Sequence, residues 1–454
     1  MKTLIANGTV VNSDGEQRAD VLIEDGRVAR VGPDLAAEGA KVVDARGCFV
    51  LPGFVDTHTH FDLDLGFTKT ADDFITGSKA ALLGGTTTVL DFATQEPGGT
   101  LAQALETWHQ KARGSSCNYG FHMAIARFDE ATEAELPAMS AAGVTSYKMY
   151  MVYHGLRMDD GSIYAALKAV AKQNALLGAH CENWDVLLRM VGEVRARGIT
   201  GPEGHPLSRP SAVEAEAVAR LMRIAELAGT PVYVVHLSTK EGLLEAQRAR
   251  SRGQEVYLET CPQYLLLTDE RYRGAGGAKF VMSPPLRKQE DCDALWRGLA
   301  EGDIDFIGTD HCSFTMAQKA RGKDDFSLTP NGSAGVQHRG ELLYTYGVRA
   351  GRITLPRMVE LLSHNPARLF GMEGRGKVAE GYAADLAVWD PAASYCITDE
   401  NPAHACDNSP YAGFEIEGRA RDVFVNGAHA VENFALAKPG MGKYICRKGC
   451  IHTR

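Results

Sequence analysis

Eight short apolar runs, separated by stretches with helical periodicity, constrain the fold of this chain more than any other feature of its sequence. Such runs are typical of parallel strands that are buried on both faces, and their alternation with amphipathic helices predicts a parallel α/β fold. Eight strands with helices between them indicate a TIM (β/α)8 barrel. The runs span residues 49–55, 86–92, 119–125, 145–147, 175–179, 231–235, 255–261 and 305–309, with helical stretches at 165–173, 212–228 and 241–250.

Residues able to bind a metal ion follow several of these runs. The first run leads into Asp56-Thr57-His58-Thr59-His60, where two histidines at i and i+2 of an extended segment project to the same side. Taken alone, this pair fits ordinary histidines as well as a metal site. A TIM barrel carries its chemistry at the C-terminal ends of its strands, so the polar residues at these ends are expected to meet. The later runs end at Lys148, His180, His236 and Asp310.

Composition is that of a large soluble enzyme. The chain has 454 residues, 44% of them hydrophobic, and a net charge of -9, which disfavours nonspecific nucleic-acid binding. No apolar run approaches the roughly 20 residues of a membrane span, and the first residues do not form a secretory signal. The ten cysteines are scattered singly, which predicts reduced thiols. We therefore expect a cytoplasmic protein without a nucleic-acid or membrane partner.

Both ends of the chain have the pattern of short strands joined by tight turns. Asn7-Gly8, Asp14-Gly15 and Asp25-Gly26 interrupt residues 3–48, and Asn426-Gly427 interrupts residues 385–428. Two such half-sheets predict one small β-sandwich built from both termini. The expected division is residues 1–50 for the first part of the sandwich, 51–375 for the barrel, 376–435 for the second part of the sandwich, and 436–454 for a C-terminal tail with a possible subunit contact.

Seven segments, spread from the first predicted strand to the last, resemble the cyclic amidases of the amidohydrolase superfamily, specifically dihydropyrimidinase and D-hydantoinase. The resemblance implies a zinc hydrolase with a barrel and a β-sandwich. It also implies a homotetramer, although the short basic tail leaves a homodimer possible. The matching segments are Gly53–His60, Ser146–Met151, His205–Pro210, Glu259–Leu265, Met282–Arg287, Gly308–Cys312 and Pro330–Gly332.

The resemblance also implies two Zn²⁺ ions per subunit. One zinc is expected on His58, His60 and Asp310 and the other on His180 and His236. Lys148, as N6-carboxylysine, and a hydroxide would bridge the two ions. An unmodified ammonium cannot bind a cation, whereas a carboxylated lysine offers two anionic oxygens. The alternative is a salt-bridged lysine, but an unpaired ammonium in an apolar strand is costly.

Further residues are expected to take part in the chemistry or to surround the metal ligands. Asp310 is expected to act as general acid and base, the alternative being a plain metal ligand. The hydroxyl of Tyr153 is expected to donate to the developing oxyanion, the alternative being a packed aromatic on a loop. Backbone groups of Ser283 and Asn331 are expected to bind the acceptor-donor-acceptor edge of a cyclic imide. His122 and His311 are expected to support the site or the core, and Cys312 to line the pocket.

The substrate class is the least constrained feature. Leu65, Tyr150 and Leu156 are candidates for a pocket around the ring substituent, and the alternating segment Phe61–Phe67 fits a lid with its apolar residues on one side, or an ordinary loop. We expect opening of 5,6-dihydropyrimidines and 5-substituted hydantoins to N-carbamoyl amino acids. The alternatives are a related ring amidase, allantoinase or dihydroorotase, and a noncatalytic scaffold that has kept the fold.

Overall fold

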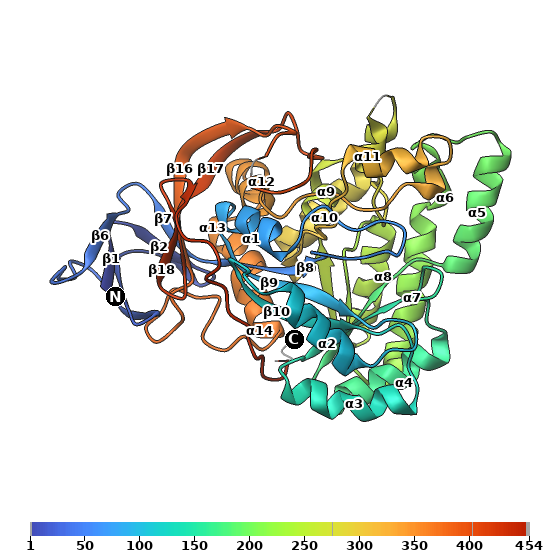
Figure 1. Cartoon of the computed structure of the whole chain (residues 1–454), viewed down its shortest axis with the longest axis horizontal. Helices are drawn as coiled ribbons and strands as arrows, with labels where there is room; N and C mark the ends of the chain where they lie inside the picture. The colour runs from blue at the N-terminus through green and yellow to red at the C-terminus, as the bar shows by residue number, and fades with distance from the viewer. Residues whose placement is uncertain (1, 275, 402, 451–454) are drawn as a thin grey trace.

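The computed structural model describes residues 2–274, 276–401 and 403–450, which form a barrel and a smaller two-sheet β unit beside it (Figure 1). The barrel sheet has eight parallel strands in sequential order. It closes where Thr59 pairs with His311 and the His60 N–H donates to the His311 carbonyl at 2.8 Å. The predicted TIM-barrel class is confirmed. The strands are β8 (Phe54–Thr59), β9 (Thr86–Thr94), β10 (Asn118–Ala124), β11 (Ser146–Tyr150), β12 (Leu176–His180), β13 (Val232–Val234), β14 (Val256–Thr260) and β15 (Phe306–Ile307).

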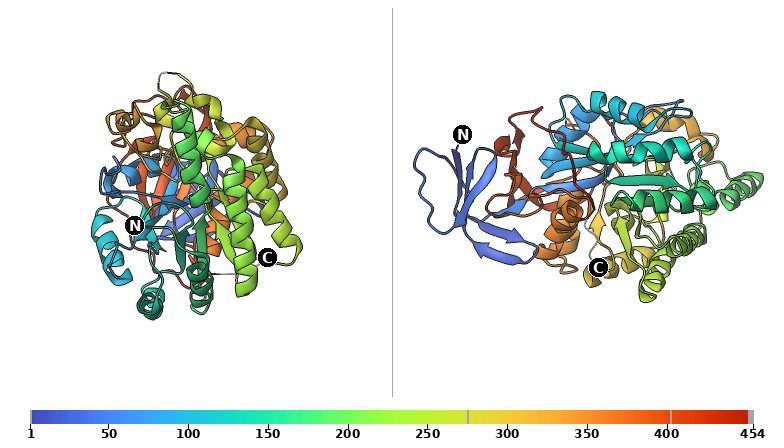
Figure 2. Two further views of the ribbon diagram at one scale, coloured as in Figure 1. Left: turned by 90° about the vertical axis from the view of Figure 1, so that its right-hand side faces the viewer. Right: turned by 90° about the horizontal axis from the view of Figure 1, so that it is seen from below.

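Helices surround the barrel because each connection between strands has an apolar face that must be buried (Figure 2). Many of them begin at an Asp, Thr or Asn whose side chain accepts a backbone N–H of the first turn, which satisfies an otherwise unpaired donor. The longer helices are α1 (Phe74–Leu83), α2 (Leu101–Lys111), α3 (Glu130–Ala141), α4 (Asp160–Ala171), α5 (Trp184–Ala196), α7 (Ser211–Ala228), α8 (Lys240–Ser251) and α10 (Gln289–Glu301).

Shorter helices lie in the loops that carry the barrel's C-terminal face and in the segment after β15. The loop helices are α6 (Gly204–Ser208), α9 (Pro262–Leu266) and α11 (Met316–Lys319). The segment after β15 contains α12 (Arg339–Leu343), α13 (Leu355–Val359) and α14 (Asn365–Leu369). Among the described residues, no helix has both the length and the apolarity of a membrane span. All ten cysteines are free thiols.

The first apolar run is divided between two sheets. Its first half is β7 (Phe49–Pro52), which belongs to the β unit, and its second half begins β8 of the barrel. Pro52 has no N–H with which to continue a ladder. Gly53 follows it, and a Cβ at Gly53 would lie 2.2 Å from the Thr87 hydroxyl. The prediction that residues 49–55 form one barrel strand is therefore wrong at its N-terminal half.

The β unit joins both ends of the chain, as the turn dipeptides predict. Its seven-stranded sheet has the order β19-β18-β17-β16-β7-β2-β3, and its four-stranded sheet has the order β5-β4-β1-β6. The N-terminal and C-terminal parts meet where β16 pairs antiparallel with β7. The strands are β1 (Lys2–Ala6), β2 (Thr9–Asn12), β3 (Gly15–Arg18), β4 (Asp20–Glu24), β5 (Arg27–Gly32), β6 (Lys41–Asp44), β16 (Leu386–Cys396), β17 (Glu415–Val425), β18 (Ala428–Glu432) and β19 (Ala435–Leu436).

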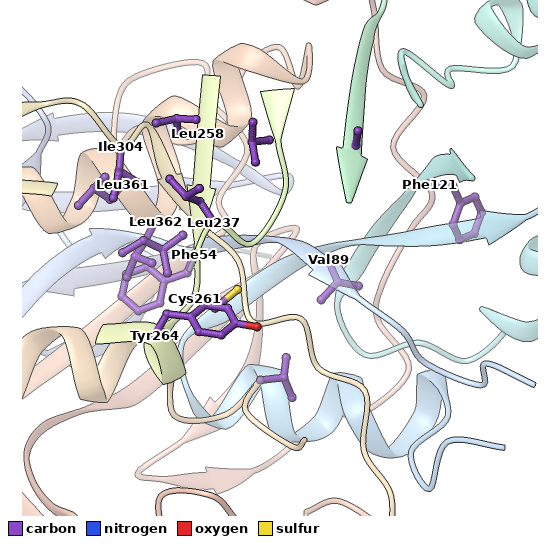
Figure 3. Close-up of a cluster of buried hydrophobic side chains, with 14 of the residues drawn as sticks. Phe54, Val89, Phe121, Leu237, Leu258, Cys261, Tyr264, Ile304, Leu361 and Leu362 are labelled. Atoms are coloured by element: carbon purple, nitrogen blue, oxygen red, sulfur yellow. The ribbon is translucent and has the colours of Figure 1, made fainter. Parts of the chain in front are cut away.

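A continuous apolar core joins the barrel strands to the helices outside them. Figure 3 shows Phe54 of β8 and Leu258 of β14 in one cluster with Leu361 and Leu362 of the segment after β15. A separate cluster between the two sheets of the β unit includes Val21 and Phe424. The strand positions are therefore fixed by packing on both faces, which gives the side chains at the strand ends a rigid support.

The C-terminal tail lies on the barrel of its own chain. The Lys443 carbonyl accepts the N–H of Tyr119, and the Ile445 N–H donates to the Tyr119 carbonyl at 2.8 Å. Arg447 is buried, and its Nη1 donates to the Ser146 hydroxyl at 2.8 Å. The described part of the tail therefore covers the barrel near the N-terminal ends of β10 and β11. The expected subunit contact of residues 436–454 stays a prediction.

Candidate active site

Three of the predicted ligands meet where the first and last barrel strands come together. His58 is the fifth residue of β8, His60 directly follows that strand, and Asp310 lies three residues after β15. The Oδ1 atom of Asp310 lies 3.2 Å from Nε2 of His58 and 3.3 Å from Nε2 of His60. His58 and His60 project to the same side of the extended segment, as their spacing predicts.

The other two histidines approach from the middle of the barrel sheet. His180 ends β12, and His236 follows β13. Their rings are 4.5 Å apart, and the rings of His58 and His236 are 5.3 Å apart. One ligand atom each from His58, His236 and Asp310 lies within 4.8 Å of the others. Four imidazoles from three strand ends therefore lie in one group, and those of His58, His60 and His236 lie near the Asp310 carboxylate.

Lys148 lies in the middle of this group. It is the third residue of β11, and its side chain is buried. Its Nζ is 3.1 Å from Nε2 of His58 and 4.2 Å from the centre of the Phe92 ring. Burial lowers the pKa of Lys148, which favours the neutral amine. The structure thus brings all six predicted ligands together.

Two glutamates hold the imidazoles in defined orientations. Glu259 of β14 bonds to Nδ1 of His58 at 2.5 Å and also accepts the main-chain N–H of His236 at 3.0 Å. Glu182 bonds to Nε2 of His180 at 2.7 Å. A carboxylate on one ring nitrogen fixes the tautomer and leaves the other nitrogen as a donor of electrons. Nε2 of His58 and Nδ1 of His180 are thereby left to bind a cation.

Three of the candidate residues have left-handed backbone conformations. The φ angles are +40° for His236, +52° for Asp310 and +79° for Tyr153. Residues other than glycine, asparagine and aspartate rarely adopt this region, and it costs about 1 to 3 kcal/mol. The surrounding hydrogen bonds must therefore hold these residues in place, which is typical of functional sites.

The donor set fits metal ions. With Nδ1 of His58 bonded to Glu259, its Nε2 faces Asp310, so that two electron-rich atoms converge on one point. Burial acts against a positive charge on His58, but Glu259 and then Asp310 outweigh it and raise its pKa. Nδ1 of His236 is buried without a hydrogen-bond partner. Imidazole nitrogens and carboxylate oxygens with this arrangement suit zinc or a similar divalent ion.

The remaining predicted residues border the metal-ligand group. The ring of Tyr153, which follows β11, lies 5.1 Å from that of His180. Burial raises the pKa of Tyr153, so its hydroxyl is a proton donor at neutral pH. Ser283 is buried and Asn331 is half-buried, and their loops are joined by a hydrogen bond of 3.0 Å from the Gly332 N–H to the Val281 carbonyl.

The three candidates for the substituent pocket separate into two groups. Tyr150 and Leu156 pack with Tyr153 against Phe92 in one apolar cluster. Leu65 is 38% exposed on a hairpin in which Asp64 pairs with Lys69. Of the two alternatives for residues 61–67, a lid with its apolar residues on one side or an ordinary loop, the structure fits the loop. Phe61 is fully buried and packs on Phe74 of α1, whereas Phe67 is 51% exposed, because Asp62 has a φ of +56° and turns the chain.

The two additional histidines are part of the support. Nε2 of His122 donates to the Thr57 carbonyl at 3.0 Å, so its Nδ1 accepts from the Ser146 hydroxyl at 2.6 Å. Nδ1 of His311 accepts the N–H groups of Gly335 and Val336, and its Nε2 donates to Asp72 at 3.1 Å. Burial raises the pKa of Cys312, which makes it a poor nucleophile.

Reasoning from the sequence did not identify four residues that shape the site. Glu259, Glu182, Arg209 and Lys319 are all buried. Arg209 pairs with Glu182 at 2.6 Å. The sequence did contain a signal for two of them. Glu259 and Glu182, like Lys148, are charged residues inside or just after an apolar run, where an unpaired charge is costly.

Comparison with known proteins agrees with this geometry. The model of the Amidohydrolase family matches residues 49–429. A D-hydantoinase of Geobacillus stearothermophilus is 40% identical over 98% of this chain and 97% of its own length. A D-phenylhydantoinase of Escherichia coli is 41% identical over 99% and 98%. The crystal structure of a dihydropyrimidinase from Brevibacillus agri covers 100% of both chains with 38% identity and a TM-score of 0.98.

These relatives match the chain over its whole length, so the comparison includes the residues of the site as well as the fold. The match to these relatives spans the barrel and the β unit, and the converging histidines, lysine and aspartate all lie inside residues 49–429 of the family match. The chain therefore belongs to the amidohydrolase family, in its dihydropyrimidinase and D-hydantoinase branch.

Proposed function

We propose that this protein is a binuclear zinc hydrolase that opens 5,6-dihydropyrimidine and 5-substituted hydantoin rings to N-carbamoyl amino acids. The convergence of His58, His60, Lys148, His180, His236 and Asp310 carries the proposal. The names of its relatives support cyclic amides as the substrate class. Bound zinc would supply Lewis acidity and lower the pKa of a water molecule.

The residues of this chain have distinct tasks in that reaction. His58, His60 and Asp310 would hold one zinc, and His180 and His236 the other, with carboxylated Lys148 between them. Asp310 faces this group and can take a proton from the attacking water and return it to the leaving ring nitrogen. The hydroxyl of Tyr153 can donate a hydrogen bond to the carbonyl oxygen as negative charge develops on it.

The surroundings of the site favour a neutral ring over one with a carboxylate. Arg209 is close enough to influence Tyr153, but its guanidinium is already paired with Glu182 at 2.6 Å. A carboxylate-bearing ring such as dihydroorotate would need a cation that is free to pair with it. Dihydroorotase activity is therefore disfavoured. The six converging ligands also disfavour a noncatalytic scaffold, which has no need of them.

The test is a substrate ranking with the zinc-supplied enzyme. Purified protein would be assayed against dihydrouracil, a 5-aryl hydantoin, allantoin and dihydroorotate, with its zinc content measured in the same preparation. We expect two zinc ions per subunit and the highest kcat/KM values for dihydrouracil and the hydantoin. A preparation without stoichiometric zinc, or one that prefers allantoin or dihydroorotate, would reject the proposal.

A further inference from the structure

Lys319 at the end of α11 is a fully buried lysine with an unusual set of partners. Its Nζ donates to the carbonyls of Val281 at 2.8 Å, Pro330 at 3.0 Å and Gly332 at 2.7 Å. No carboxylate forms an ion pair with it in residues 2–274, 276–401 or 403–450. An ammonium has three N–H donors, so the three carbonyls satisfy it completely. Burying this charge is costly and calls for an explanation.

The three carbonyls belong to the two loops that carry Ser283 and Asn331. Val281 lies two residues before Ser283, and Pro330 and Gly332 flank Asn331. One side chain therefore fixes both loops at once. The Val281 carbonyl also accepts the Gly332 N–H at 3.0 Å, which completes a direct link between the loops.

Other side chains hold the carbonyls that surround Ser283. Nε2 of His205 donates to the Met282 carbonyl at 2.7 Å, and the Tyr264 hydroxyl donates to the Pro284 carbonyl at 2.9 Å. The main-chain N–H and carbonyl of Ser283 and of Asn331 form no hydrogen bond with any described residue. The carbonyls on either side of Ser283 already accept hydrogen bonds. Ser283 and Asn331 each keep a free main-chain N–H donor and a free carbonyl acceptor.

The loop that carries Asn331 is also fixed relative to the metal-ligand group. Gly332 has a φ of +142°, and a Cβ there would lie 2.3 Å from the Cys312 carbonyl. Only glycine allows the loop to pass so close to the segment that begins at Asp310. Lys319 holds the other side of the same loop, so the position of Asn331 relative to Asp310 is determined from two directions.

We propose that Lys319 is a positioning residue whose ammonium sets the distance between the free main-chain groups of Ser283 and Asn331, and that this spacing selects the edge of a cyclic imide. The inference rests on the proposed function, because it assumes that these two residues bind the ring. A ring edge with alternating acceptors and donors requires groups at fixed separations. A buried ammonium between two loops supplies such a separation without touching the substrate.

The test compares Lys319→Met with Lys279→Met. Methionine fills similar space and removes all three donors. Lys279 is the matched control because it precedes the same loop, but its Nζ pairs with Asp399 at 2.9 Å on the outside. For Lys319→Met we expect KM to rise roughly 10- to 100-fold, as expected for a shift of about 1 Å in binding groups. We expect normal zinc content, a smaller change in kcat, and no change in the control.

The two substrates provide a readout that a general loss of structure would not give. Dihydrouracil and a 5-aryl hydantoin share the ring edge but differ in the substituent. Lys319→Met should therefore raise both KM values by the same factor and leave their ratio unchanged. An unchanged KM, a loss of zinc with normal KM, or a shift in the substrate ratio would each overturn the positioning role. Lys319→Gln, which keeps two donors, should give an intermediate KM and serves the same comparison if the methionine variant does not fold.

Hydrogen exchange separates this proposal from the proposed function. In the absence of substrate, peptides covering residues 281–284 and 330–333 should exchange faster in Lys319→Met than in the wild type or in Lys279→Met. Equal exchange in all three proteins would overturn the positioning role, whatever the enzyme hydrolyses. Wild-type protein that opens neither imide would instead reject the proposed function, while the exchange result would still report on Lys319.

Discussion

Two buried lysines near the barrel mouth differ in what surrounds their amino groups. The Nζ of Lys319 donates to three carbonyls, which match the three N–H groups of an ammonium and oppose the burial that lowers its pKa to about 7. The Nζ of Lys148 has no carbonyl partner among the described residues and faces Nε2 of His58 and the ring of Phe92. Burial lowers the pKa of Lys148 and so favours its neutral amine, the form that reacts with carbon dioxide.

Replacement of Lys148 by alanine tests the proposed bridge. We expect Lys148→Ala to lose most of its zinc and activity, because a cavity replaces an anionic ligand between two cations. Short carboxylic acids should restore part of the activity by occupying that cavity. Zinc analysis and turnover would be compared with Lys172→Ala, a surface variant on the helix end after β11. Full zinc and full activity in Lys148→Ala would contradict the bridge.

The hydroxyl of Tyr153 can be tested without changing the packing of its ring. Tyr153→Phe should lower kcat by roughly 10²-fold or more, the usual cost of losing one oxyanion donor. The zinc content should stay the same, because the hydroxyl belongs to none of the predicted ligands. Tyr164→Phe on α4 is the control, since that ring is 38% exposed. Normal turnover, or loss of zinc, would assign Tyr153 another role.

At the scale of secondary-structure elements, two loops contribute the candidate pocket for the ring substituent. Leu156 lies in the turn after β11, where the Leu156 N–H donates to the Tyr153 carbonyl at 3.3 Å. Leu65 lies on the hairpin after β8, which Gln318 of α11 holds through the Lys69 carbonyl at 2.6 Å. Each loop follows a strand that carries a predicted metal ligand, so changes in the loops can alter specificity without disturbing the metal site.

Trimming either leucine should change the preference between substrates. In Leu65→Ala and Leu156→Ala we expect the ratio of kcat/KM for a 5-aryl hydantoin over dihydrouracil to fall by about 10- to 200-fold, equivalent to about 1 to 3 kcal/mol of lost apolar contact. We expect the larger effect at Leu156, which packs on Tyr150 and Tyr153. Leu227→Ala, at a residue of α7 that is 78% exposed, is the control. Equal losses for both substrates would exclude these residues from the pocket.

At the scale of the whole molecule, the tail packs on the barrel as far as Cys450, the last residue that the structure describes. Ile445 and Cys450 join the apolar cluster that contains Val55 and Leu90. The Cys450 N–H donates to the Asn174 carbonyl at 2.9 Å. The tail therefore contributes to the same core that fixes the strands of the active site, although it lies at the opposite end of the barrel.

Removal of residues 442–454 should destabilise the barrel and leave ring recognition intact. Several barrel groups, among them the N–H and carbonyl of Tyr119, would lose their partners at about 1 to 3 kcal/mol each where they are buried. We expect the midpoint of thermal unfolding to fall by several degrees, measured against Lys443→Ala, whose side chain is exposed. An unchanged midpoint would contradict this role of the tail. Light scattering of the same proteins would test whether the tail also supports the expected homotetramer.

The barrel and its candidate ligands could be predicted because both depend on local patterns. An apolar run that is buried on both faces and an intervening amphipathic helix are visible within about ten residues of sequence. Parallel strands then place their C-terminal ends at one edge, which brings Lys148, His180, His236 and Asp310 toward the His58 and His60 pair. The turn dipeptides of the β unit, including Asn426-Gly427 with φ angles of +50° and +78°, were visible for the same reason.

Other features depend on contacts between residues far apart in the chain, which no local pattern contains. Lys319 joins two loops that begin 38 residues before it and end 13 residues after it. Glu259 orients His58 across 201 residues, and the tail reaches the barrel across more than 300. Periodicity determined which segments form strands and which polar residues stand at their ends. Tertiary packing alone decided which buried charges face each other, because only the closed barrel brings those side chains within hydrogen-bonding distance.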